Sequence, residues 1–352
     1  MKEKIKSIKG ITLVALVVTI VVLLILASIT MTLLMNGGLI DKTKNATAIY
    51  KQSEATENNG LNRLNDKVDI ILNGETLQTL QEAKADDIKT TPTTENSKVV
   101  LSDGTIAVPQ GFKLISGSAA KVSTGAVIED AIGNQYVWIP VSDISNYIRK
   151  DFGVDDGAYS NYYENMPSNE QDSVTRYKGY YIGRYESGID TLRTSASQQV
   201  VNSSMRIKNN MPPFFFVTRN QAIAVSESDD WKPNGKAYPT AKTKLCSSYA
   251  WDTALVFIGK TVTNYATNSV QDNFSTYLKN TGTPSSTAVC NIFDMGGNVY
   301  EWSTESNHTS YPCVSVGGVY YGSATARPAG SRSSNTLTYS CNVIGFRTTL
   351  YL

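Results

Sequence analysis

Near its C-terminal end the chain reads Asn291-Ile-Phe-Asp-Met-Gly-Gly-Asn-Val-Tyr-Glu-Trp302. Gly296-Gly297 allows positive φ angles, which residues with a Cβ resist. Asp294, Asn298 and Glu301 supply oxygen atoms around that turn, and such oxygens are the ligands that Ca²⁺ prefers. The residues expected to anchor the turn in a core are Val299, Tyr300 and Trp302. Two interpretations follow: a cation site, or a glycine-rich turn in which Glu301 pairs with an arginine.

Further motifs occur in a fixed order along the chain: Tyr180–Glu186, Pro213–Ala222, Leu245–Ala254 with Trp251, Val316–Tyr321, and Ile344-Gly-Phe-Arg347. Together with the first stretch they resemble the formylglycine-generating-enzyme (sulfatase-modifying factor) superfamily, over roughly residues 110–352. That family has a variant of the C-type lectin fold. The resemblance implies an α+β head of short strands and long loops. It says little about activity, because one fold hosts many functions.

The resemblance also implies a structural Ca²⁺ ion. The family's calcium ligands match Asp294, Gly297, Val299 and Glu301, with backbone carbonyls acting at the middle two positions. All four residues are chemically compatible with such a site.

An enzyme is not expected. Aerobic members of the family hold copper with two cysteines shortly after the Gly-Gly strand, but residues 317–327 contain no cysteine, and Cys313 and Cys341 do not match. The iron-binding branches would need more histidines than the single His308. We therefore predict no catalytic residues. The four cysteines, which include Cys246 and Cys290, could form disulfides or stay free thiols.

The N-terminus predicts a membrane anchor. Lysines precede Ile11–Met35, which contains no charged residue, and about 20 apolar residues span a bilayer as a helix. Cytoplasmic lysines would place the rest of the chain outside the cell. The predicted location is thus a bacterial cell membrane with an extracellular head.

The first ten residues resemble the leader of type IV prepilins, which is cut after a glycine and methylated at the new N-terminus. Here the cut would fall between Gly10 and Ile11. The sequence departs from the family at Ala15, where pilins carry a glutamate. This departure weighs against assembly into a pilus-like filament.

The predicted domains are a leader at 1–10, a transmembrane helix at 11–35, a helical stalk or tether at 36–74, a linker at 75–97, and the lectin-like head at 98–352. Within the head, Val99–Leu101, Ile106–Val108, Phe112–Ile115 and Tyr136–Val141 alternate as strands do. Asp143–Lys178 is interpreted as an excursion loop.

The segment 306–352 is rich in tyrosine, serine and asparagine, a composition that antibody paratopes also use. Its candidate ligand-binding residues are Tyr311, Tyr320, Tyr321, Ser323, Thr325, Ser333, Asn335, Thr338, Tyr339 and Asn342. The segment contains no Lys, Glu, Gln, Met or Trp, the residues that an AAY codon cannot reach when its adenines are randomised. It therefore resembles the variable ends of diversity-generating retroelement targets; compositional bias is the alternative explanation.

Two functions remain open. The first is an anchored display protein that binds an unknown protein or glycan ligand through a non-catalytic head. The second is a minor pilin or pseudopilin that contacts other pilin-like subunits. The net charge of +1, without a basic run beyond the N-terminus, argues against nucleic acid as a partner.

Overall fold

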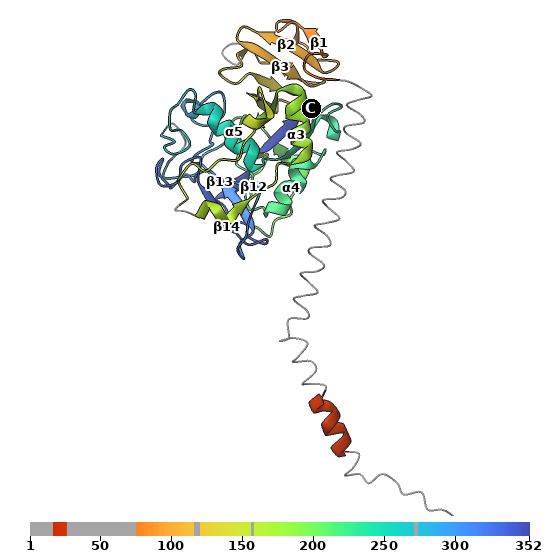
Figure 1. Cartoon of the computed structure of the whole chain (residues 1–352), viewed down its shortest axis with the longest axis vertical. Coiled ribbons are helices and arrows are strands. Elements are labelled where there is room, and N and C mark those ends of the chain that lie inside the picture. Colours follow the sequence, from red (N-terminus) through yellow and green to blue (C-terminus); the bar gives the residue numbers. More distant parts are fainter. Residues whose placement is uncertain (1–16, 27–74, 116–119, 156–157, 271–273) are drawn as a thin grey trace, which may run out of the picture. The chain divides into compact units, whose positions relative to one another are not determined.

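The structure, a computed structural model, describes residues 17–26, 75–115, 120–155, 158–270 and 274–352. The chain divides into two compact units, Met1–Val68 and Asp69–Leu352. In the first unit residues 17–26 are helical (Figure 1). The leader, its processing site at Gly10 and Ile11, and the stalk at 36–74 lie outside the described residues.

The structure contradicts the predicted membrane-spanning helix. No helix among the described residues is both long and apolar enough to cross a bilayer. The described part of the predicted span is residues 17–26, which are helical. The predicted membrane localisation depended on that span and is contradicted with it.

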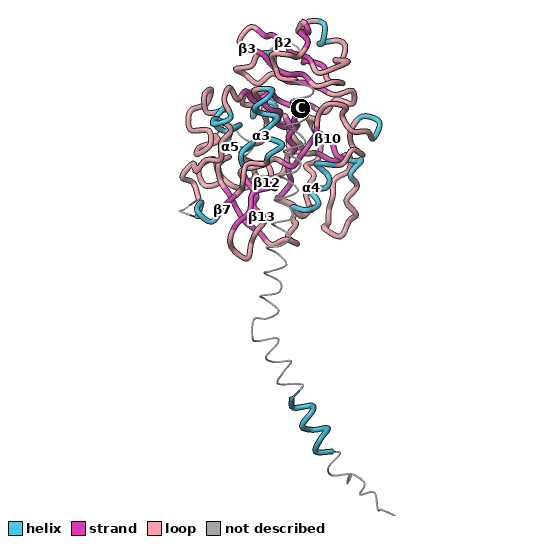
Figure 2. The backbone as a smooth tube through the Cα atoms, turned by 45° about the vertical axis from the view of Figure 1, so that its right-hand side comes forward, coloured by secondary structure: helices cyan, strands magenta, loops and turns pink. Residues whose placement is uncertain are grey.

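The second unit is a mixed structure of small sheets and three described α-helices (Figures 1 and 2). A three-stranded sheet contains β1 Gln81–Ala83, β2 Ser97–Leu101 and β3 Gly104–Val108. A six-stranded sheet has the order β11 Lys242–Leu245, β16 Thr348–Tyr351, β8 Gly179–Gly183, β6 Gln135–Pro140, β5 Val127–Glu129 and β4 Lys113–Leu114. A five-stranded sheet has the order β14 Arg332–Asn335, β13 Cys313–Val316, β12 Tyr300–Asn307 and β15 Ile344–Phe346, with β7 Tyr162–Tyr163 also paired to β12. A two-stranded ribbon joins β9 Gly188–Ile189 and β10 Met205–Arg206.

The helices begin and end at residues suited to those positions. α3 Ser168–Tyr177 ends at Lys178, whose φ of 62° is left-handed. α4 Arg219–Glu227 begins with a capping box between Thr218 and Gln221, which satisfies two backbone donors reciprocally. α5 Ser248–Ile258 is capped by Ser247 and is buried along most of its length. Short 3₁₀ turns occur at η1 Asp87–Lys89, η3 Ile144–Asn146, η4 Ala158–Asn161, η5 Asn202–Ser204, η6 Pro233–Gly235 and η7 Ser285–Thr287.

The predicted family motifs fall on the central elements. Tyr180–Glu186 coincides with β8, Pro213–Ala222 leads into α4, and Leu245–Ala254 spans the end of β11 and the start of α5. The predicted strand residues Val99–Leu101 lie in β2 and Tyr136–Val141 largely in β6. The second unit thus combines helices with several small sheets.

Two segments contain more structure than their composition indicates. The stretch 75–97, interpreted as a linker, contains β1, which pairs in parallel with β2, and buries Leu77, Leu80 and Ile88. The stretch 143–178, interpreted as a loop, contains η3, η4, β7 and α3. In both, the pairing partners lie elsewhere in the sequence, so local composition carries no sign of them.

Candidate ligand-binding face

The quoted C-terminal stretch forms a buried turn that leads into β12. Asp294, Gly297 and Asn298 have φ angles of 58°, 87° and 46°, so this turn uses the left-handed backbone region that glycine adopts at no cost. Beyond the turn, β12 pairs in parallel with β15 and antiparallel with β13. The three strands therefore bring together the turn before β12, the Val316–Tyr321 motif and the Ile344-Gly-Phe-Arg347 motif.

The carboxylate of Glu301 is held by Arg347. The Nε of Arg347 donates to one oxygen of Glu301 at 2.9 Å and an Nη donates to the other at 2.6 Å. The guanidinium also donates to the carbonyls of Gly183 and Phe293, at 2.8 Å each. Burial raises the pKa of Glu301 to about 7 despite the opposing effect of Arg347. Of the two sequence interpretations, the structure shows the arginine pair.

The residues as placed do not fit the predicted Ca²⁺ ion. A guanidinium cation already binds both oxygens of Glu301, the carboxylate that the resemblance assigns to calcium. An oxygen of Asp294 accepts from the backbone N–H of Gly282 at 2.7 Å. Among the described residues, no three His, Cys, Asp or Glu side chains gather as a metal site would require. The calcium site through Gly297 and Val299 stays a prediction with this geometry against it.

Glu186, which the sequence analysis did not single out, fastens the same turn. Its carboxylate accepts from the side-chain amide of Asn298 at 2.6 Å and from the backbone N–H of Val299 at 3.2 Å. Burial raises the pKa of Glu186 well above its ordinary value, and Asp294 and Glu301 raise it further. In the sequence, Glu186 stands out only as the last residue of the Tyr180–Glu186 motif. That position does not reveal which residues bond to its carboxylate.

Asn298 also forms hydrogen bonds with two loops at the surface. Its backbone carbonyl accepts from the N–H of Tyr320 at 2.9 Å, and its side-chain oxygen accepts from the N–H of Lys279 at 3.1 Å. The carbonyl of Tyr320 in turn accepts from Ser275 at 2.6 Å. Two loops that are distant in sequence are thereby fixed to one buried residue, one through its backbone carbonyl and the other through its side chain.

Above this base lies a cluster that we call the tyrosine face: Tyr300, Tyr320, Tyr321, Arg327 and Tyr339. The rings of Tyr320 and Tyr321 meet edge to face at 5.0 Å between centroids. Burial raises the pKa of Tyr300, with Arg327 opposing and Tyr321 adding to the shift. A hydrogen bond with Cys341 raises the pKa of Tyr339, and Tyr321 contributes as well. These electrostatic contacts place the members of the cluster beside one another.

All ten predicted ligand-binding residues are at least partly exposed. Tyr321, Tyr339 and Tyr311 expose 62%, 41% and 52% of their surface. Tyr320, Ser333 and Asn335 are half-buried, and the exposed remainder is Ser323, Thr325, Thr338 and Asn342. By contrast Val316, Val319, Ile344 and Phe346 are buried.

The ten residues do not form one continuous site. Tyr311 lies in the turn between β12 and β13, and Ser333 and Asn335 lie on β14, which borders β13. Near that side of the sheet, the ring of Tyr163 stacks on His308 with centroids 4.0 Å apart. The tyrosine face instead combines the loop after Val319 with the turn around Tyr339.

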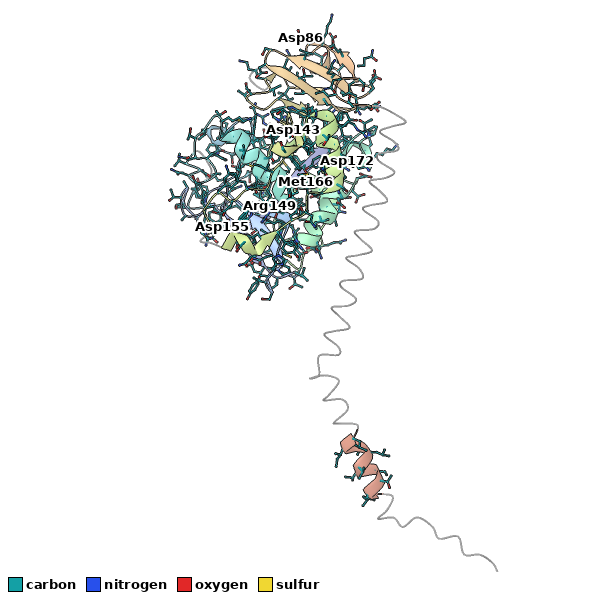
Figure 3. The ribbon with its side chains drawn as sticks, in the orientation of Figure 1. Asp86, Asp143, Arg149, Asp155, Met166 and Asp172 are labelled. Atoms are coloured by element: carbon teal, nitrogen blue, oxygen red, sulfur yellow. The ribbon has the colours of Figure 1, made fainter. Side chains whose placement is uncertain are left out.

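Arg332 on β14 is buried. Arg332 pairs with Asp252 and with Glu305, at 2.7 Å in each case, and its backbone N–H donates to Asp155 at 2.8 Å. Arg149, which is labelled with Asp155 in Figure 3, also binds Glu305. Burial alone would lower the pKa of Arg332, but Asp252 and Glu305 together raise it. This network ties β14 to α5 and β12.

The missed members of the surface are Tyr300, Tyr277, Lys279 and Leu337. Tyr300 was expected in the core, but it is only half-buried and packs against the core's edge. Tyr277 and Leu337 expose 64% and 53% of their surface. The available signal in the sequence was Tyr277, in the loop before the Gly296-Gly297 turn. No local pattern connects that loop with Tyr320.

No protein-family model matches the chain, and no curated protein matches it. Three solved structures are similar to it. CarF is 15% identical, with a TM-score of 0.36 over 63% of this chain and 99% of that one. Treponema denticola variable protein 1 is 14% identical, with a TM-score of 0.34 over 68% and 99%. PvdO from Pseudomonas aeruginosa is 12% identical, with a TM-score of 0.33 over 65% and 98%.

At such low TM-scores and identities, the likeness carries no argument about activity, ligand or partner.

Proposed function

We propose that the second unit is a non-catalytic ligand-binding module whose contact surface is the tyrosine face. The observation that carries this proposal is the group of two exposed rings, Tyr321 and Tyr339, with the half-buried Tyr320 beside them, set on a turn fixed by buried ion pairs and hydrogen bonds. Tyrosine provides rigid amphipathic contact area at a low cost in conformational entropy. A surface that is already ordered loses less entropy when it binds.

The chemistry of the thiols supports the non-catalytic part of the proposal. All four cysteines are free thiols, and Cys246, Cys290 and Cys313 are buried. Burial raises the pKa of each of these three, which disfavours the thiolate that metal binding and nucleophilic attack require. Cys341 lies in the turn beside Tyr339 and is separated in sequence from the other three.

The composition of 306–352 supports diversification of this surface. Most of the exposed positions are Tyr, Ser, Thr and Asn, with His308, Ala326, Arg327 and Leu337 as the others, whereas the buried arginines at 332 and 347 hold the scaffold. A retroelement would then alter the face without removing its base. The observation that tests this is the gene's neighbourhood, which should contain a reverse transcriptase gene and a near-repeat of the 3′ end.

The binding surface can be tested with a displayed library of random peptides panned on the full-length chain. Peptides that bind the parent are then measured against Tyr321→Ala and Tyr339→Ala. Tyr163→Ala is the matched control, because Tyr163 is also exposed, at 43%, but lies on β7. We expect Tyr321→Ala and Tyr339→Ala each to weaken binding about tenfold, as the loss of an aromatic anchor does.

The control variant should bind the selected peptides as the parent does, and circular dichroism melts should show all three variants folded. If the peptides bind Tyr321→Ala and Tyr339→Ala with parental affinity, the tyrosine face is not the binding surface.

A further inference from the structure

The charges of the C-terminal part of the head are distributed unevenly between core and surface. From residue 274 to 352 the side-chain carboxylates are Asp294, Glu301 and Glu305, and all three are buried. The buried cations Arg332 and Arg347 pair with them or with Asp252. The lysine and arginine side chains that reach the surface in this segment are Lys279 and Arg327. The surface of the segment is therefore positive.

Both cations stand among aromatic rings. The ammonium group of Lys279 lies 5.1 Å from the ring centroid of Tyr277, while Arg327 is near enough to Tyr300 to affect its pKa. Neither forms an ion pair with a carboxylate of the described residues. The two are linked through one scaffold, because Lys279 and Tyr320 both bond to Asn298.

We propose that the tyrosine face, extended by Tyr277 and Lys279, binds an acidic segment of a partner protein. This inference rests on the proposed function and adds the chemical class of the ligand. Aspartate or glutamate side chains of the partner would pair with Arg327 and Lys279, and apolar side chains between them would pack on the tyrosine rings. Complementary charge speeds encounter and fixes the register of such a complex.

The composition of the face favours a protein over a sulfated or carboxylated glycan. Tyrosine and arginine are enriched in the centres of protein interfaces, and the surrounding rim is polar and solvent-accessible, as charged pairs at Lys279 require. Leu337, which exposes 53% of its surface, lies two residues from Tyr339 and adds apolar area that a polar glycan chain would not cover. Two cations also provide few contacts for a ligand that carries an anion on every sugar.

The test measures binding of the full-length chain to three immobilised probes: poly-L-glutamate, poly-L-lysine and heparin. The variant Arg327→Glu/Lys279→Glu reverses both surface cations. Its matched control, Lys84→Glu/Lys236→Glu, changes the net charge equally at exposed lysines outside this segment. We expect binding to poly-L-glutamate that weakens about tenfold or more in the first variant, and that falls steeply with added salt.

The control variant should bind poly-L-glutamate within about twofold of the parent, since local rather than net charge is responsible. Three outcomes overturn the inference: binding to heparin without poly-L-glutamate, equal losses in both charge variants, or no binding to either anionic polymer. In each of these cases the dependence of selected peptides on Tyr321 and Tyr339 remains a separate measurement, so the proposed function can stand while the acidic partner fails.

Discussion

Three arginines in the C-terminal segment show how differently the same residue type is used. Arg332 and Arg347 are almost fully buried, and each is neutralised by carboxylates from other elements. Arg327 is exposed, among tyrosines and without such a partner in the described chain. The first two hold strands together, whereas the third remains accessible to another molecule.

The comparison shows that a polar, variable-looking segment can contain both a scaffold and a surface. A buried charge without its partner is costly, whereas an exposed one is solvated at almost no cost. Substitution should therefore have opposite consequences in the two places: loss of stability at the buried pairs, and loss of binding with little change in stability at the face.

The largest effect is expected at the buried pair. Glu301→Ala removes the partner of Arg347 and leaves a guanidinium unneutralised in the core, which costs about 3–5 kcal/mol. Chemical denaturation of parent and variant measures the difference. Phe346→Ala, which removes a core ring packed 5.5 Å from Phe214, should cost a similar amount, about 3–5 kcal/mol, through a cavity.

The double variant Glu301→Leu/Arg347→Leu separates the ion pair from the packing. If the pair matters as described, this double variant should be more stable than Glu301→Ala alone.

Added Ca²⁺ should leave the melting temperature of the parent unchanged, because Arg347 already binds the carboxylate. A rise in melting temperature with Ca²⁺ would show that the ion binds after all and that the arginine pair does not replace it.

A smaller effect is expected at a buried carboxylate that lacks a cation. Glu164 accepts from the N–H and hydroxyl of Ser248 and from the hydroxyl of Thr304. Burial raises the pKa of Glu164 to about 7 from 4.5. A carboxyl with a raised pKa in the folded state contributes stability at low pH, and that contribution is lost as the pH rises through about 7.

The stability of the head should therefore fall between pH 5 and pH 8, and Glu164→Gln should reduce that fall by about 1–3 kcal/mol. Glutamine keeps an acceptor for Ser248 but does not titrate. Glu95→Gln is the control, since Glu95 is exposed and its replacement should leave the pH profile as it is. A parental profile in Glu164→Gln would mean that the carboxyl is charged in the folded head.

The sequence predicted those elements that depend on residues within one short motif. The glycine turn before Trp302 and the strand Ile344–Phe346 both follow from local patterns. The sequence analysis offered an arginine as the partner of Glu301, and the structure shows this arginine to be Arg347, which also donates to two backbone carbonyls.

What the sequence did not predict depends on contacts between distant segments. Glu186 accepts a hydrogen bond from Asn298, which lies more than a hundred residues away in the sequence. Arg332 donates to Asp252, which also belongs to a distant segment. Surface composition alone also could not distinguish Arg332 from Arg327, although one is buried and the other exposed. The membrane span was predicted from apolar length alone, and the described residues contain no helix that meets that requirement.

The smallest effect on stability is expected at the tyrosine face. Tyr321 exposes 62% of its surface, so Tyr321→Ala should change the free energy of unfolding by less than about 1 kcal/mol, as surface substitutions do. Tyr320→Ala should cost slightly more, because Tyr320 is half-buried and its ring meets that of Tyr321. Each substitution should nevertheless weaken binding of the selected peptides by roughly 1–2 kcal/mol. Denaturation and binding measured on the same preparations separate the two effects. If Tyr321→Ala unfolds the head as readily as Glu301→Ala does, the ring belongs to the scaffold, and the division between buried pairs and an accessible face is wrong.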